Sequence, residues 1–217
     1  MKSVLLILFL STPVLAQQQD FQIDPLEFSD CLPRWDRNIQ KQKASRLPEI
    51  RHQLLQLIKY EKAKTERAKL LHRLAVNYYQ QYEAKKDKKY LAESIKVMQK
   101  LIQDHPGYPK LDEAYLVFGE ALWHGGRDME ALKVFKMFIK LYPKSPESTR
   151  AFIHFAEFLF KKQDYKRTLT MLTKAESFGP SEYSYCLSHR IAYCHHKLGD
   201  TQQAIEWLNK ANELRSR

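Results

Sequence analysis

The sequence is poor in the residues that build sheets, tight turns and disulfide frameworks. It has 6 glycines and 3 cysteines among 217 residues. Alternating runs of β-branched residues and Asn-Gly turns, which are typical of strands and hairpins, are absent. Long stretches rich in Leu, Ala, Lys, Glu and Gln take their place. The composition therefore predicts an all-α protein.

The motifs that accompany most enzyme chemistry are also missing. The chain has no Gly-rich phosphate loop, no Gly-x-Ser-x-Gly turn, no Cys-x-x-Cys pair and no His-Glu-x-x-His helix. Cys186 and His189 share a helix face, but two ligands do not make a zinc site, and a third would have to come from His124 or His154 in another repeat. We therefore predict no metal, no cofactor, no catalytic residue and no enzymatic activity.

The sequence also lacks a hydrophobic run long enough to span a bilayer. Its longest apolar run lies among the first residues. Lys2 precedes an apolar run over residues 4–10, and small residues stand before Gln17. A bilayer span needs about 20 apolar residues, so this pattern predicts a cleaved signal peptide at residues 1–16. A lipid anchor would need a cysteine at the cleavage point, whereas the first one is Cys31. We expect a periplasmic or secreted protein.

Acidic residues are too few to balance the basic ones. The formal net charge is +11 at pH 7. In an exported protein this charge favours acidic partners, anionic lipid or cell-wall polymer, and we expect no nucleic acid as partner. Lysines cluster on one stretch of predicted helix and in one turn, where the plainest interpretation is a solvated face: Lys133, Lys136, Lys140 and Lys144, and Lys85, Lys86, Lys88 and Lys89.

The cysteines do not form a framework. Cys186 and Cys194 are eight residues apart in a predicted helix, which separates them by about 12 Å along the axis and prevents a bridge between them. At most one disulfide, from Cys31 to one of these two, is expected.

The prolines that close amphipathic segments are regularly spaced. Pro106, Pro143 and Pro180 follow one another at intervals of 37 residues, which is a spacing typical of repeat proteins. Each interval contains two segments of helical period joined by a turn. The predicted units are residues 67–106, 110–143, 147–180 and 182–215. The first unit has seven extra residues near its turn, and about two helical turns absorb them without changing the inward face.

Small residues recur where the two helices of a unit meet. They are Ala75, Gly119, Ala156 and Ala192 in the first helices and Ala131 and Ala204 in the second helices, with Ser94 and Thr168 at the matching positions of the other units. Bulky partners follow at Phe135, Leu172 and Leu208. A small residue allows two helix axes to approach closely. This pattern resembles the tetratricopeptide repeat, which implies a right-handed α-solenoid of about four helix-turn-helix units.

Two segments precede the predicted array of residues 67–217. Residues 44–66 form a leading amphipathic helix that has Pro48 in its first turn and covers the first repeat. Residues 17–43 lack a helical period although they contain apolar side chains. We expect this extended segment either to dock along the array or to reach into a second copy and form a homo-oligomer.

The resemblance implies that first helices line a concave groove in which peptide ligands lie. Aromatic side chains, flanked by cations and two carboxylates, fall on that face. The predicted partner-binding residues are Tyr79, Gln80, Leu116, Glu120, Trp123, His124, Ile153, Glu157, Phe160, Lys161, His189, Tyr193, His196 and Lys197. For the rings the alternative is ordinary packing between repeats.

The sequence thus favours a binding protein. The leading hypothesis is a periplasmic adaptor that holds a peptide or protein partner in its groove within an envelope complex, similar to repeat proteins of outer-membrane assembly, Tol-Pal or gliding machinery. The alternative is a surface-binding protein whose convex lysines bind anionic lipid or cell-wall polymer.

Overall fold

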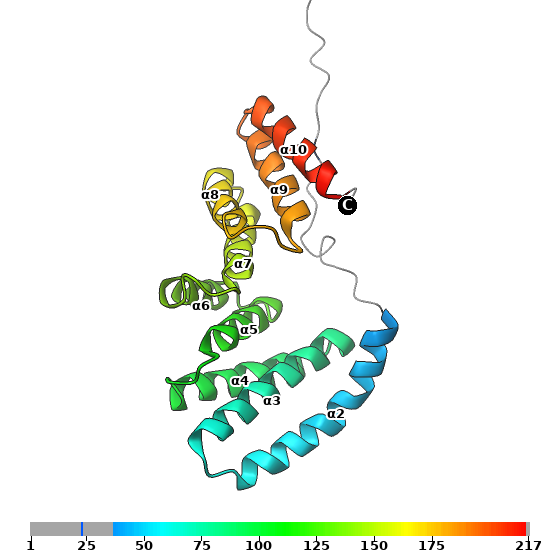
Figure 1. Ribbon diagram of the computed structural model, residues 1–217, viewed down its shortest axis with the longest axis vertical. Coiled ribbons are helices and arrows are strands. Elements are labelled where there is room, and N and C mark those ends of the chain that lie inside the picture. The colour runs from blue at the N-terminus through cyan, green and yellow to red at the C-terminus, as the bar shows by residue number, and fades with distance from the viewer. Residues whose placement is uncertain (1–22, 24–36, 216–217) are drawn as a thin grey trace, which may run out of the picture.

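The computed structural model describes Ile23 and residues 37–215. Within these residues the chain is all-α, and nine helices stack in order from α2 to α10 (Figure 1). After α2 (Arg37–Tyr60) the helices are α3 (Lys64–Lys85), α4 (Lys89–Asp104), α5 (Leu111–His124), α6 (Asp128–Leu141), α7 (Ser148–Lys161), α8 (Tyr165–Glu176), α9 (Ser184–Lys197) and α10 (Thr201–Arg215). The predicted fold class is confirmed.

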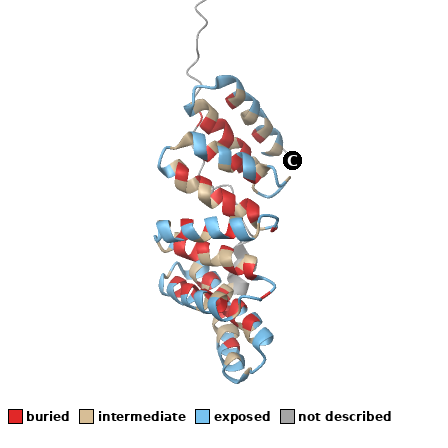
Figure 2. Cartoon of the chain, turned by 90° about the vertical axis from the view of Figure 1, so that its left-hand side faces the viewer, coloured by how far each residue is buried: buried red, intermediate tan, exposed pale blue. Residues whose placement is uncertain are grey.

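Consecutive helices form antiparallel pairs that stack into an elongated array. Each helix packs mainly on its neighbours in the chain, and α3 also contacts α5. In Figure 1, α6 and α8 lie on the left, and α5 and α7 lie to their right. The buried residues in Figure 2 follow the inner faces of the stack, and exposed residues cover its outer faces. Each pair therefore shares its core with the next pair, as repeat proteins do.

The extra residues of the first repeat lengthen its helices. The first helix α3 has 22 residues, whereas α5, α7 and α9 have 14 each. The turn between α3 and α4 contains only residues 86–88, and Lys86 there has a positive φ of 55°. The prediction that both helices absorb the insertion is confirmed for α3. The second helix of this repeat, α4, is 16 residues long, compared with 14 for α6.

Close helix contacts occur at the predicted small residues. Gly119 lies so near Phe135 that a Cβ atom built on it would be 2.5 Å from the ring. The two polar replacements are also buried: the Ser94 hydroxyl donates to the Ala75 carbonyl at 2.9 Å, and the Thr168 hydroxyl donates to the Asp164 carbonyl at 2.7 Å. Because both hydroxyls have partners, these replacements do not leave a buried polar group unsatisfied.

The turn inside each later repeat uses a left-handed residue at one position. Gly126, Gln163 and Gly199 have φ angles of 78°, 57° and 82°. This conformation ends a helix without steric cost only when the residue is glycine. The third repeat therefore keeps the turn although glutamine occupies its left-handed position.

The leading helix differs from its predicted bounds. α2 spans Arg37–Tyr60, whereas the sequence predicts an extended chain to residue 43 and a helix over residues 44–66. Proline is favoured in a first turn, but Pro48 lies inside α2, where it removes one backbone hydrogen bond. The helix ends at Tyr60, earlier than predicted, and the Arg67 guanidinium donates to the carbonyls of Ile58 and Glu61, each at 3.1 Å.

The contacts of α2 make it a cover for the first repeat. Leu47 and Leu54 are 8% and 3% exposed. The Asn77 amide of α3 donates to the Leu47 carbonyl at 3.1 Å, and Arg51 donates to Gln81 at 2.6 Å. These polar contacts fix α2 along α3.

The predicted signal peptide at residues 1–16 lies outside the described residues, and so does the rest of the segment from residue 17 to residue 36 apart from Ile23. Ile23 is 7% exposed and belongs to a cluster with Ala192, Tyr193 and Ala204 of the last repeat. An apolar side chain from the beginning of the chain therefore packs at the far end of the array.

Candidate binding surface

The predicted partner-binding residues lie on α3, α5, α7 and α9, and the surface of these helices is called the first-helix face. Trp123, near the end of α5, is partly exposed. The ammonium of Lys161 lies 4.2 Å from the centre of its ring, and the His154 ring lies 6.2 Å away. Residues from α5 and α7 thus meet in one aromatic and cationic group.

A second ring group lies at the boundary of the first two repeats. Tyr79 is 9% exposed and packs between Tyr82 and His124, with ring centroids 6.4 and 6.1 Å away. Burial raises the pKa of Tyr79 well above its ordinary value, so the phenol stays neutral. His124 and Gln80 are exposed. Here the tyrosine contributes to packing, and its polar neighbours remain at the surface.

A third ring group joins the last two repeats. Phe160 lies 5.4 Å from the Tyr193 ring, and the guanidinium of Arg190 lies 4.0 Å from the centre of Phe160. The Lys197 ammonium lies 5.3 Å from the centre of the Tyr193 ring. Tyr193 also belongs to the cluster of Ile23, so this end of the face already holds an aliphatic side chain.

The two predicted carboxylates pair with arginines of the following repeat. Glu120 is 3% exposed and accepts hydrogen bonds from Arg150 at 2.6 Å and from His154 at 3.1 Å. Glu157 lies 3.2 Å from Arg190, which is buried. These two carboxylates are therefore paired with arginines across two successive repeat boundaries.

The environment of Glu120 keeps it ionised. Burial by itself raises the pKa of this carboxyl group, but the hydrogen bond from His154 and the charge of Arg150 outweigh it and leave the pKa below its ordinary value. Arg150 in turn has its pKa raised by Glu120, against the effect of burial. A buried charge of this kind is stable only while its partner is present.

The other predicted residues divide between the core and the surface. Leu116 and Ile153 are 1% and 5% exposed, so they pack inside the stack. His189 and His196 are half-buried, and the His189 ring lies 6.2 Å from Tyr185. Among the predicted residues, Gln80, His124, Lys161 and Lys197 are exposed and Trp123 is partly exposed.

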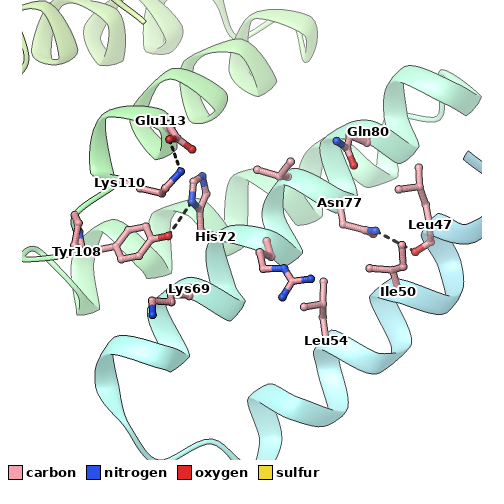
Figure 3. A pocket seen from close by; sticks show the side chains of 13 residues that line it. Leu47, Ile50, Leu54, Lys69, His72, Asn77, Gln80, Tyr108, Lys110 and Glu113 are labelled. Atoms are coloured by element: carbon pink, nitrogen blue, oxygen red, sulfur yellow. Dashed lines mark hydrogen bonds and ion pairs between the residues drawn. The ribbon is translucent and has the colours of Figure 1, made fainter. Parts of the chain in front are cut away.

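Sequence reasoning missed a pocket at the first end of the array. Its volume is about 580 Å³, and its walls come from α2, from α3 and from the segment that leads into α5 (Figure 3). Only Gln80 among the predicted binding residues lines it. The helical register of α3 places His72 and Val76 on the same face as Gln80, but the opposing wall depends on the position of α2, which periodicity does not give.

The cysteines and histidines do not form a reactive cluster in the part of the chain that the structure describes. Within it, no three His, Cys, Asp or Glu residues are placed to hold one metal ion. Cys186 is disulfide-bonded, and Cys194 is free and buried. The prediction that these two do not bridge each other is confirmed, while Cys31 lies outside the described residues. Burial raises the pKa of the Cys194 thiol to about 12, which makes it a poor nucleophile.

The lysines of the outer surface are exposed. Lys133, Lys136 and Lys140 line α6, and Lys144 follows it. None of the four forms an ion pair within residues 44–215. The Lys136 ammonium lies 5.4 Å from the centre of the Phe155 ring. This row leaves a strip of unbalanced positive charge along α6.

The fold and its surface define a stacked helical-repeat protein. Two segments match family models of the tetratricopeptide repeat, residues 113–145 and residues 187–217. The first covers most of α5 and all of α6, and the second covers most of α9 and all of α10. The repeats predicted from residue spacing are therefore confirmed as tetratricopeptide repeats at these two places.

Solved structures with the same arrangement support the fold. The crystal structure of MamA superposes with a TM-score of 0.63 at 14% identity, covering 81% of this chain and 92% of that one. The TPR-like repeats described as those of a Podosopora anserina kinesin light chain give 0.60 at 14% identity, with coverage of 83% and 91%. The MamA 41-end structure from Desulfovibrio magneticus RS-1 gives 0.51 at 16% identity, with coverage of 80% and 96%.

No curated protein matches the sequence. Among the helices that the structure describes, none combines the length and the apolar character that a bilayer crossing requires.

Proposed function

We propose that this chain is a periplasmic or secreted adaptor whose first-helix face binds a peptide or protein partner within a cell-envelope complex. The matches to the tetratricopeptide repeat support the binding role, because stacked repeats present one continuous surface to a partner. The envelope setting depends on the signal peptide expected at residues 1–16. No catalytic residue is assigned.

The observation that carries the proposal is the charge left on the first-helix face. Glu120 and Glu157 already pair with arginines, whereas Lys161 and Lys197 lie on ring faces and form no ion pair in the described part of the chain. Rings with adjacent cations suit a partner that presents apolar side chains and carboxylates together.

The test is affinity purification with the mature protein, residues 17–217, from envelope extracts of the source cells. Trp123→Ala is expected to reduce the retained partner about tenfold or more, because truncation of a central aromatic residue often costs 2 kcal/mol or more. The matched control is Tyr60→Ala, which removes a ring that is 71% exposed at the end of α2. Equal loss with both variants, or no specific partner, contradicts the proposal.

A second function is favoured by the lysine row on α6. Because its charges are unbalanced, we propose as the alternative that it binds anionic lipid or cell-wall polymer. Sedimentation with vesicles that contain phosphatidylglycerol tests it. Binding should weaken with added salt and with the double variant Lys133→Glu and Lys140→Glu, and salt-independent binding contradicts it.

A further inference from the structure

The pocket at the first end of the array has apolar walls from two helices. Leu47, Ile50 and Leu54 of α2 lie opposite α3 (Figure 3), and Val76 of α3 also lines the pocket. Its volume of about 580 Å³ is in the range of pockets that bind specific ligands, about 300–1,000 Å³. The pocket therefore has room for a bulky side chain together with the adjoining backbone.

A buried imidazole lines this pocket. His72 is 5% exposed, and its Nδ1 lies 3.1 Å from the Tyr108 hydroxyl. Its Nε2 is buried and has no hydrogen-bond partner among the residues that the structure describes. When Tyr108 donates to Nδ1, the neutral ring carries its proton on Nε2, so His72 has a donor available for an acceptor from a ligand.

The basic side chains around the pocket differ in whether they pair with an acidic residue. Lys69 pairs with Glu66 at 2.6 Å, and Lys110 pairs with Glu113 at 2.7 Å. Arg73 is exposed, lines the pocket and forms no ion pair in the region that the structure describes. The guanidinium of Arg73 is therefore the cation that remains for a ligand, and a carboxylate is the group that it binds best.

We propose that this pocket binds a segment of the partner protein in which a bulky apolar side chain stands beside a carboxylate. The apolar side chain enters between α2 and α3, and the carboxylate accepts hydrogen bonds from Arg73 and His72. Gln80, at the other end, supplies an amide for the backbone of the segment. This assignment rests on the proposed function and names the chemistry of its partner.

An apolar side chain from a distant part of the sequence packs at the opposite end of the array. At the last repeat, Ile23 packs beside Ala192 and Tyr193, distant in sequence from both. That end of the array therefore holds one of the chain's own residues, and the pocket between α2 and α3 is a separate site with apolar walls.

The probe is an array of synthetic peptides of about ten residues that carry one central Leu or Phe. One set places Asp at each position within four residues of it, and a twin set places Asn there. The mature protein is expected to bind the best Asp peptides about tenfold more tightly than their Asn twins, measured by fluorescence anisotropy. Equal affinity for both sets overturns the proposal.

Variants then locate the binding. Arg73→Glu should weaken the best Asp peptide about tenfold or more, and Ile50→Trp, which fills the pocket, should abolish binding. Lys100→Glu is the matched control, because it makes the same charge change on an exposed residue of α4 and should leave the affinity unchanged. Since Arg73 is exposed, its variant keeps the fold, which circular dichroism verifies.

The outcome separates this site from the general function. If a partner protein is lost with Trp123→Ala but is unaffected by Arg73→Glu and Ile50→Trp, the pocket proposal is wrong and the adaptor proposal stands. Equal weakening by Arg73→Glu and Lys100→Glu also overturns the pocket proposal, because it indicates nonspecific charge attraction. Loss of the partner with Arg73→Glu but not with Lys100→Glu supports it.

Discussion

The Lys161 ammonium lies 4.2 Å from the centre of the Trp123 ring, so two residues expected to contact a partner contact each other across a repeat boundary. This pair links the end of α5 to the end of α7 and keeps the ring in place. A partner that binds here adds to a preorganised pair and does not need to order two free side chains.

Removing Lys161 tests the strength of this pair. Lys161→Ala should lower the free energy of unfolding by about 0.5–1 kcal/mol, because exposed cation–π pairs contribute about that much. Lys162→Ala is the control, since its side chain is exposed and contacts no ring in the described structure. Urea denaturation of both variants measures the difference, and equal stabilities contradict the interpretation.

At Gly119 the packing against Phe135 leaves no space for a side chain. A Cβ atom there would lie 2.5 Å from the ring of Phe135, which is fully buried and stacked on His154 at 4.8 Å. Gly119→Ala should destabilise the fold by about 1–2 kcal/mol even though alanine favours helix, because overpacking costs about 1–3 kcal/mol.

Gly107→Ala is the matched control for that variant. In the part of the chain that the structure describes, no atom lies within 4 Å of a Cβ built at Gly107, so its effect should stay within about 0.5 kcal/mol. Chemical denaturation gives both values. A neutral Gly119→Ala would mean that the two helices do not approach as closely as described.

The repeat architecture was predictable because its signals are local. The spacing of Pro106, Pro143 and Pro180 and the small residues at helix contacts reflect packing inside each pair, and the structure has these pairs. The bounds of α2 were not predictable from Pro48, because the position of a proline within a helix depends on tertiary contacts such as that of Asn77 with Leu47.

The binding face was harder to predict than the fold. Periodicity placed Glu120 and Glu157 on one face, but it could not show that arginines of the next repeat reach them. Arg150 and Arg190 stand at different registers, 30 and 33 residues after their partners, so no repeat period predicts these pairs. Periodicity also could not predict the pocket between α2 and α3, because it does not give the position of α2.

The Glu120–Arg150 pair predicts how stability depends on pH. The folded-state pKa of Glu120 is below its ordinary value of 4.5, so the pair contributes stability above that pH and loses it as pH falls through the folded value. Glu120→Gln should cost about 2 kcal/mol near neutral pH, because it weakens a buried charged hydrogen bond.

Denaturation of both proteins between neutral pH and about pH 3 checks this expectation. The difference between wild type and Glu120→Gln should be constant above the ordinary value of 4.5 and shrink below it. A difference that stays constant down to the acid limit would show that Glu120 does not carry this dependence.

The left-handed turns predict opposite effects of two substitutions. Gly199→Ala should destabilise by about 1 kcal/mol, because φ is 82° there. Gln163→Gly should stabilise by up to about 0.5 kcal/mol, because it relieves the strain of a glutamine at φ 57° but adds freedom to the unfolded chain. Thermal unfolding of both variants measures this, and two changes of the same sign contradict the assignment.

Site-specific photo-cross-linking tests the central claim, that a partner binds the first-helix face, most directly. A photoreactive residue replaces Trp123 in one protein and the exposed Lys133 of α6 in another, and both are irradiated in envelope extract. The adaptor proposal predicts one discrete cross-linked protein from position 123 and none from position 133. Cross-links from position 133 alone, or from neither position, would contradict it.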